Sequence, residues 1–365
     1  MAFRFFLSIL AWLLAGFGVA FAQTPAVYTA ADAHADAAPK VAGQTVEALA
    51  AYLAQAGPAD SVRVRAAYRW VTRQVAYDVN TYLQFGQSGV MVSTGNGAAE
   101  TRLAAQKADR VLQSRMAVCQ GYSNLMAALC KEMDIPAEVV AGYNKGITYQ
   151  QSGRIALNHA WNVVQVGGRW RPLDATWGAG VVEGRRYVPK YSEEFFLPAP
   201  DAFVQKHLPA DPAYQLLAKP VRFADFTRAT VPVDAALALP DTLNLMASLP
   251  DTVKAYRSNQ RAARFYPENA LPYLKLSEYH ATKALGLFAR FNDETKGFYR
   301  ENLPATVPIK QLLTDIELHL NASRGYLQRI SRSDANMHQI AQSSMKLIDS
   351  NLRVLDKTRA FWLKG

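Results

Sequence analysis

The sequence predicts an α+β domain followed by an all-α domain. Between residues 46 and 133, apolar side chains recur every three or four positions, which is the spacing of amphipathic helices. Over residues 137–177 the pattern changes to short runs rich in Val, Trp and Tyr with turns between them, which is typical of antiparallel strands. Residues 251–365 return to helical spacing. At about 100–200 residues per domain, the length of 365 residues also indicates two domains.

The first residues have the layout of a secretory signal peptide, expected over residues 1–22. Arg4 precedes an apolar run that ends near Leu14, and Ala20-Phe21-Ala22 offers a small-residue cleavage site. We therefore expect cleavage near Ala22 and a secreted or periplasmic protein, with an uncleaved membrane anchor as the alternative. No later apolar run is long enough to span a bilayer, so the mature chain is expected to lack a transmembrane segment.

The helices of the α+β domain are expected to come before its sheet. Residues 23–60 are expected to form a flexible leader, over 23–43, and a short helix that Thr45 can cap. A core over residues 61–222 follows, and its Gly- and Ser-rich stretch over residues 86–97 predicts a mobile loop. Helices are expected over residues 46–56, 61–75, 98–112 and 118–133.

The end of the chain is expected to be a connector followed by a helical domain. Pro232, Pro240 and Pro250 interrupt any regular element within the connector, residues 223–250. In the helical domain, residues 251–365, two apolar stripes follow each other and predict an antiparallel helical hairpin. The stripes run from Ile309 to Ile330 and from Ile340 to Leu355.

The composition is that of a folded protein with a basic surface. The chain is 50% hydrophobic and 19% charged, which excludes a disordered chain, a collagen and a pure coiled coil. Residues 251–365 hold 18 basic and 11 acidic residues, which is most of the net charge of +10. We expect these helices to bind an anionic envelope polymer, the alternative being that the charge only keeps the protein soluble. Without a basic motif interleaved with aromatic residues, no specific nucleic-acid partner is expected.

Cys119 is a candidate nucleophile because it stands where the buried helix begins. The N–H groups and the dipole at a helix start favour a thiolate, the reactive form of cysteine. Most cysteines at such positions are small core residues, so a base and an orienting group are needed to support catalysis. Cys130 lies eleven residues further along the helix, about 16 Å away, which excludes a disulfide between the two.

His159 and Asp174 are expected to lie side by side on the sheet. If Gly167-Gly168 forms a two-residue hairpin turn, Trp161 faces Asp174 on the neighbouring strand. His159 is then a diagonal neighbour of Asp174 on the same face, although a slip of one residue would break the pair. Asp174 can hold one ring nitrogen while the other faces Cys119. A lone histidine on an apolar strand is more often structural. The spacings match no zinc motif, so no metal is expected.

Two sequence segments resemble the transglutaminase-like superfamily. They are VCQGYSNLMAALCKEMDIPAEVVAGY and NHAWNVVQVGGRWRPLDATWG, and the upstream WVTRQVAYD fits the helix that precedes them in that family. The later FFLPAPDAFVQKHLPADPAYQLL is similar to a segment of its kyphoscoliosis-peptidase-like branch. The resemblance covers about residues 60–222. It implies a papain-like fold with helices packed on an antiparallel sheet, and a catalytic triad of Cys119, His159 and Asp174.

The resemblance further implies an oxyanion hole and a substrate cleft. The hole would combine the backbone N–H of the nucleophile with a second donor, for which Gln113, Tyr82 and Gln84 are candidates; a solvent-facing Gln113 is the alternative. Trp161 and Trp177 flank the triad residues and either line the cleft or belong to the core. His207 is expected to be structural or on the surface.

Together these features predict an exported, cofactor-independent cysteine enzyme. It is expected to be a peptidase-like hydrolase of protein or peptide amides that works through a thioester. One alternative is a transglutaminase, in which a lysine amine resolves the thioester. The other is a non-catalytic envelope scaffold that uses the same fold to hold partners.

Overall fold

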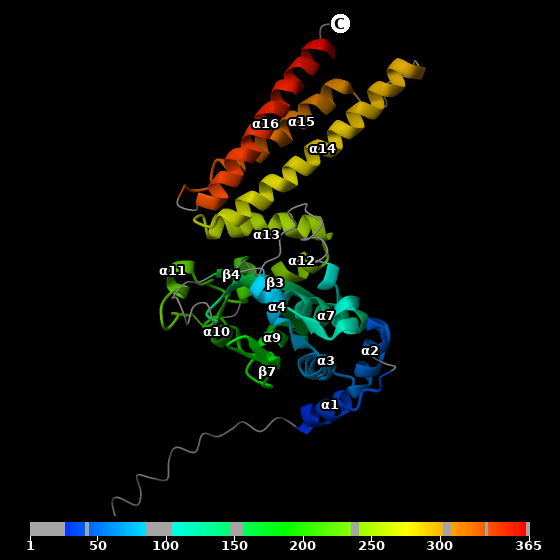
Figure 1. Ribbon diagram of the computed structural model, residues 1–365, viewed down its shortest axis with the longest axis vertical. Coiled ribbons are helices and arrows are strands. Elements are labelled where there is room, and N and C mark those ends of the chain that lie inside the picture. The colour runs from blue at the N-terminus through cyan, green and yellow to red at the C-terminus, as the bar shows by residue number, and fades with distance from the viewer. Residues whose placement is uncertain are drawn as a thin grey trace, which may run out of the picture.

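The computed structural model describes residues 26–40, 44–84, 104–146, 156–234, 241–301, 308–332 and 335–362 (Figure 1). The expected α+β core and the helical C-terminal region are both confirmed, and α13 lies between them (Figure 1). The expected signal peptide and the expected loop over residues 86–97 lie outside the described residues. None of the described helices combines the length and apolar character needed to cross a membrane.

The core combines short helices with three small sheets among the described residues. Its helices are α1 (Ala26–Asp36), α2 (Val46–Leu53), η2 (Ala54–Ala56), α3 (Asp60–Gln74), α4 (Val79–Gln84), α6 (Ala108–Ser114), α7 (Cys119–Glu132), α9 (Ala175–Ala179), α10 (Pro200–Phe203), η3 (Pro212–Gln215) and α11 (Phe223–Phe226). Its strands are β1 (Ala76–Tyr77), β2 (Met116–Ala117), β3 (Ala137–Asn144), β4 (Ala156–Val166), β5 (Arg169–Leu173), β6 (Gly180–Glu183), β7 (Arg186–Pro189) and β8 (His207–Pro209). The helices α12 (Asp241–Ala247), α13 (Asp251–Phe265), α14 (Ala270–Glu301), α15 (Ile309–Leu327) and α16 (Ala335–Trp362) follow.

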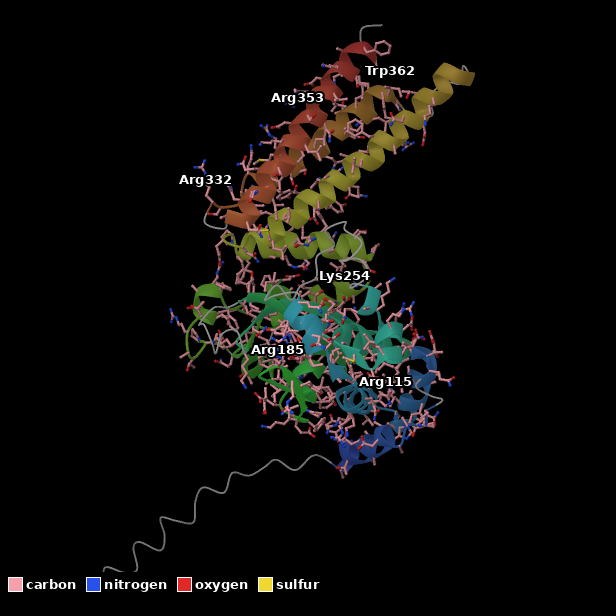
Figure 2. The ribbon with its side chains drawn as sticks, viewed as in Figure 1. Arg115, Arg185, Lys254, Arg332, Arg353 and Trp362 are labelled. Carbon is pink, nitrogen blue, oxygen red and sulfur yellow. The ribbon has the colours of Figure 1, made fainter. Side chains whose placement is uncertain are left out.

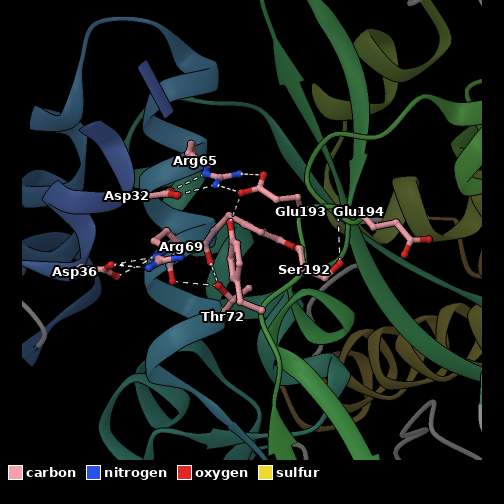
Figure 3. A network of polar contacts seen from close by, with 10 residues as sticks. Asp32, Asp36, Arg65, Arg69, Thr72, Ser192, Glu193 and Glu194 are labelled. Atoms are coloured by element: carbon pink, nitrogen blue, oxygen red, sulfur yellow. Dashed lines mark hydrogen bonds and ion pairs between the residues drawn. The ribbon is translucent and has the colours of Figure 1, made fainter. Parts of the chain in front are cut away.

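The expectation of a flexible leader over residues 23–43 is wrong for residues 26–36, which form α1. Ala31 and Ala35 are buried where α1 packs on α3. The fully buried guanidinium of Arg65 on α3 forms ion pairs with Asp32 of α1 and with Glu193 (Figure 3). The polar composition of this segment therefore reflects partners on α3 and not disorder.

The helices expected before the sheet form one layer against it. Thr45 caps α2 as expected, with its Oγ1 accepting a hydrogen bond from the Ala48 N–H. The buried faces of α2, α3 and α7 meet in one hydrophobic cluster that also includes Val164 of β4. The helix expected over residues 98–112 is interrupted at 106–107 before α6 begins.

The main sheet has the strand order β5-β4-β3-β8, and all its neighbours are antiparallel. The predicted hairpin register is confirmed, because Val166 pairs with Arg169 and the pairing continues to Asn162 and Leu173. Gly167 and Gly168 make the turn with φ values of 55° and 73°, a conformation that favours glycine. Asp174 therefore follows the last paired residue of β5.

A short parallel pair of strands, which the sequence did not predict, lies next to the start of α7. Ala76 and Tyr77 of β1 pair with Met116 and Ala117 of β2. Two-residue strands carry too little alternation to be found by pattern. The pair places Tyr77 beside the first turn of α7.

The C-terminal region is a bundle of long helices. The expected helical hairpin is confirmed as α15 and α16, and α14 packs along α15 to complete the bundle (Figure 1). Its core contains the apolar stripes of these helices, including Leu313, Ile316, Leu320 and Leu355.

The connector expected over residues 223–250 packs on the core through its helical parts. Leu243 and Met246 of α12 are buried in a cluster with Trp161 and Trp170 of the sheet. Lys254 of α13, at the boundary in Figure 2, forms a 2.7 Å ion pair with Glu138 of β3. A second ion pair at the same boundary joins Arg261 to Asp211 at 2.6 Å. The C-terminal helices are thus anchored on the core through α12 and α13.

Candidate active site

The first turn of α7 holds Cys119 in a fixed position. Val118 precedes it with an extended backbone and donates its N–H to the buried Gln106 side chain at 3.1 Å. Ser123 Oγ donates to the carbonyl oxygen of Cys119 at 2.9 Å. Cys119 is 3% exposed. The turn at Gln106, which interrupts the expected helix, therefore supplies the acceptor for a hydrogen bond just before α7. No feature of the sequence indicated this role.

His159 connects Cys119 to Asp174. Its Nε2 lies 2.6 Å from Asp174 Oδ2, and its side chain is also hydrogen-bonded to Cys119. Because Nε2 is held by Asp174, Nδ1 is the ring nitrogen available to the thiol. Burial alone would lower the pKa of His159, but the charge and hydrogen bonds of Asp174 and Cys119 raise it to about 10. The imidazole is therefore protonated at neutral pH and presents a positive charge to the Cys119 side chain.

Asp174 is a fully buried carboxylate with donors on both oxygens. Its Oδ1 caps α9 by accepting the N–H groups of Thr176 at 2.9 Å and Trp177 at 3.1 Å. Its own N–H donates to the Phe195 carbonyl at 3.0 Å. Burial would raise the pKa of Asp174, but the two histidines on Oδ2 hold it well below its usual range. Asp174 therefore stays ionised and fixed in orientation.

His207 is the second of these histidines, and of the structural and surface positions expected for it, the structure shows a buried one. It lies on β8 at the sheet edge, is 1% exposed, and places its Nε2 3.0 Å from Asp174 Oδ2. Burial lowers the pKa of His207 to about 4 despite the opposing effect of Asp174, so this imidazole is neutral at pH 7. His207 lies 33 residues after Asp174 in the sequence, so no local pattern connects the two. The only sequence feature that drew attention to His207 is its place in the later segment that resembles the family.

His159, Asp174 and His207 also form a group whose ligand atoms lie within 4.8 Å of one another, which is a possible metal-binding arrangement by distance alone. Ligands of a tetrahedral zinc ion with bonds of about 2.1 Å lie about 3.4 Å apart. The two nitrogen-to-oxygen distances, 2.6 and 3.0 Å, instead fit hydrogen bonds. We therefore assign the group to hydrogen bonding.

The two tryptophans flanking the triad residues differ in exposure. Trp161 is 1% exposed and packs beneath His159, with ring centroids 5.8 Å apart. Gly142 faces His159 across the sheet, and a side chain there would collide with the Trp161 ring. Trp177 is only partly buried, and its ring centroid lies 5.4 Å from that of His159. Of the two, only Trp177 has a partly exposed side chain.

The three candidates for a second oxyanion donor lie on the helices before α7. Gln113 and Gln84 have exposed side chains at the ends of α6 and α4. Tyr82 is partly buried against Tyr77, with ring centroids 5.9 Å apart. Tyr77, which is not among the three candidates, interacts electrostatically with Cys119, and burial raises the pKa of Tyr77 well above the ordinary value.

Cys130 has the surroundings of an inert thiol. It is fully buried in the hydrophobic cluster of the core, and burial raises its pKa to about 12. The described residues contain no disulfide that involves it. Only Cys119 therefore combines a thiol with a neighbouring base.

Comparison with known proteins identifies the part of the chain that carries this site. Residues 47–175 match the model of the transglutaminase-like superfamily, a range that includes Cys119, His159 and Asp174. His207 and the C-terminal helices lie outside it.

Three similar proteins illustrate the extent of the likeness. Kyphoscoliosis peptidase of Mus musculus is 32% identical over 48% of this chain and 24% of its own length. The Homo sapiens protein of the same name is 31% identical over 50% of this chain and 26% of its own length. The chain thus spans about a quarter of these curated relatives. A solved structure described as a TGase is 20% identical, covers 52% of this chain and 42% of its own, and has a TM-score of 0.28.

Proposed function

We propose, on the premise that residues 47–175 are a transglutaminase-like domain, that this chain is a cysteine-dependent acyl-transfer enzyme that hydrolyses amide bonds of proteins or peptides. The observation that carries the proposal is the hydrogen-bonded series from Cys119 through His159 to Asp174. A nucleophile, a base and a group that orients the base are the three parts that thiol catalysis needs.

In the acylation step, the Cys119 thiolate attacks the amide carbonyl carbon. His159 gives its Nδ1 proton to the leaving nitrogen, the C–N bond breaks, and a thioester forms on Cys119. Asp174 keeps Nε2 in place and stabilises the imidazolium before the proton leaves. Because α7 begins at Cys119, a backbone N–H of its first turn is the donor proposed for the developing oxyanion.

In the second step, water resolves the thioester. His159 takes a proton from water at Nδ1, the hydroxide adds to the carbonyl carbon, and the C–S bond breaks to release a carboxylic acid. The three acidic residues near the end of α7 do not favour an amine acceptor, since Glu132 and Asp134 lie at the opposite end from Cys119 and Glu138 is paired with Lys254. The peptidase names of the two relatives support the same choice.

The place of action and the partners extend the proposal. The signal-peptide layout of residues 1–22 supports export, so the substrate would be an envelope or extracellular protein. A basic stripe on α16 supports binding to an anionic envelope polymer: Lys346, Arg353 and Lys357 are exposed and spaced so that they share one helix face. Arg353 lies on the outer side of the bundle in Figure 2.

The test offers the purified full chain a protein substrate, casein, together with a fluorescent primary amine, and follows both by mass spectrometry. We expect cleaved or deamidated peptides without incorporated amine, and no product from Cys119→Ala. The Cys130→Ala variant is the matched control and should keep its activity. Efficient amine incorporation would show that the chain is a transglutaminase and not a hydrolase. Absence of turnover across a panel of envelope proteins would favour a non-catalytic scaffold.

A further inference from the structure

We propose that His207 is a positioning residue of this site, a neutral donor that keeps the Asp174 carboxylate ionised and aimed at His159. Two imidazoles share one carboxylate oxygen, since Asp174 Oδ2 lies 2.6 Å from His159 Nε2 and 3.0 Å from His207 Nε2. The consequence for turnover rests on the proposed function, whereas the effect on Asp174 does not.

The four donors on Asp174 show what His207 supplies. Backbone N–H groups of Thr176 and Trp177 occupy Oδ1, and the two imidazoles occupy Oδ2. Hydrogen bonds to the charged form of a buried carboxylate favour that form. Without His207, Oδ2 would keep only His159, and transfer of a proton from the imidazolium to the carboxylate would become easier.

Its surroundings keep the His207 ring neutral and fixed. The ring is stacked on Phe203 at 4.1 Å with an interplanar angle of 7°, and the Trp177 and Trp161 rings lie at 4.4 and 5.1 Å. Three charged or titratable groups act on it: Asp174 at the start of α9, His159 on β4, and the adjacent Lys206. Burial among the rings disfavours an imidazolium, so His207 donates from Nε2–H without adding a second positive charge.

A neutral donor suits this position better than a cation would. A positively charged His207 would compete with the His159 imidazolium for Asp174 and would repel it across 5.4 Å between ring centroids. The neutral form instead leaves the full charge of Asp174 to His159. In turn, the protonated His159 supports the thiolate of Cys119.

The experiment measures the rate at which iodoacetamide alkylates Cys119 in the full chain between pH 4 and 9, with Cys130 as the internal reference. His207→Phe keeps a ring on Phe203 but removes the donor, and His207→Gln restores an N–H near the same place. Loss of a hydrogen bond to a charged group predicts about tenfold slower alkylation at pH 6 for His207→Phe. The pH at which the alkylation rate falls on the acidic side should be about one unit higher than in the wild type. His207→Gln should recover most of the rate. Thermal unfolding confirms that both variants are folded.

A second measurement does not depend on a reactive thiol. In protein labelled with ¹⁵N-histidine, the His207 signals, identified by their loss in His207→Phe, should show a neutral Nε2–H tautomer from pH 5 to 8. Titration of His207 near pH 6.5 would overturn the proposal. With a reactive wild-type Cys119, so would equal alkylation profiles of the wild type and His207→Phe, or of the Phe and Gln variants. A change in the Cys119 alkylation rate of the wild type on addition of a chelator would also overturn the proposal, because it would indicate a bound metal. If wild-type Cys119 were unreactive but the tautomer were as expected, the proposed function would fail and the role of His207 toward Asp174 would stand.

Discussion

His159 Nε2 and Asp174 Oδ2 lie 2.6 Å apart, although 15 positions separate the two residues along the chain. The hairpin brings them together because β5 ends at Leu173, opposite Asn162, and Asp174 turns back to cap α9. The same carboxylate thus ends a strand, starts a helix and holds an imidazole.

Iodoacetamide should alkylate Cys119 faster than Cys130 at neutral pH. The protonated His159 stabilises a thiolate on Cys119, whereas burial raises the pKa of Cys130 to about 12. Mass spectrometry of the labelled peptides gives both rates in one sample. His159→Gln should bring the rate of Cys119 close to that of Cys130. Equal and slow labelling of both thiols in the wild type would contradict the proposed nucleophile.

Asp174→Asn should preserve the fold but lower the turnover of casein by about 10⁴-fold, by analogy with triads that lose the orienting carboxylate. The amide still accepts the N–H groups that start α9 through its oxygen, so the secondary structure is retained. It no longer stabilises the imidazolium of His159. The measurement is kcat together with the circular dichroism spectrum, and full activity of the variant would remove Asp174 from the mechanism.

The main elements of the core were predictable because they depend on patterns local in sequence. The glycine pair at 167–168 and the alternation of β4 and β5 define the hairpin register, and with it the proximity of His159 to Asp174. The position of Cys119 at the start of α7 followed from the helical spacing after it. Local periodicity therefore placed three side chains of the candidate site.

The contacts that the sequence did not predict join segments far apart in the chain. His207 reaches Asp174 because β8 pairs with β3, and a three-residue strand has no periodicity to detect. Helix α1 forms because its aspartates meet Arg65 and Arg69 of α3, which no local pattern shows. Alanine, the strongest helix former, makes up five of the eleven residues of α1, and the ion pairs with α3 hold this helix on the core.

The free energy of unfolding should be greatest near pH 6.5 as far as the two histidines determine it. The pKa of His159 is raised from 6.5 to about 10, so its contribution is complete below pH 6.5 and is lost as the pH rises through 10. The pKa of His207 is lowered from 6.5 to about 4, so the unfolded chain binds the extra proton and stability falls as the pH drops from 6.5 to 4.

Urea unfolding over a series of pH values tests these two slopes separately. Relative to the wild type, His159→Phe should lose the decline on the alkaline side, and His207→Phe should lose the decline on the acidic side. Each variant serves as the control for the other. Parallel pH profiles for all three proteins would show that neither histidine is perturbed.

Arg65→Met should destabilise the protein by about 1–3 kcal/mol, because it leaves the mostly buried Asp32 and the half-exposed Glu193 without their partner. Figure 3 shows this guanidinium between the two carboxylates. Arg69→Met is the matched control on the same helix. Its ion pair with Asp36 is partly exposed, so it should cost less than about 1 kcal/mol.

The destabilisation by Arg65→Met should also reach the candidate site. Glu193 belongs to the segment in which the Phe195 carbonyl accepts the Asp174 N–H, and Tyr68 donates to the neighbouring Ser192 carbonyl. Chemical unfolding measures the stability, and alkylation of Cys119 reports on the site. Equal costs for the Arg65 and Arg69 variants would show that the buried ion pairs do not hold α1 to the core.

Replacement of Lys346, Arg353 and Lys357 by Gln should weaken binding to heparin, used as the polyanion probe, and lower the salt concentration at which the protein elutes from it. Their spacing on α16 gathers three exposed positive charges on one face, so the loss should be largest at low salt, where screening is weak. The control replaces three other exposed basic residues, on the β6–β7 hairpin and just after it: Arg185, Arg186 and Lys190. Arg185 lies on the core, away from the bundle (Figure 2). Equal losses of heparin binding from the two triple variants would mean that the net charge, and not the α16 face, attracts the polymer. Binding that does not change with salt would exclude an electrostatic attraction.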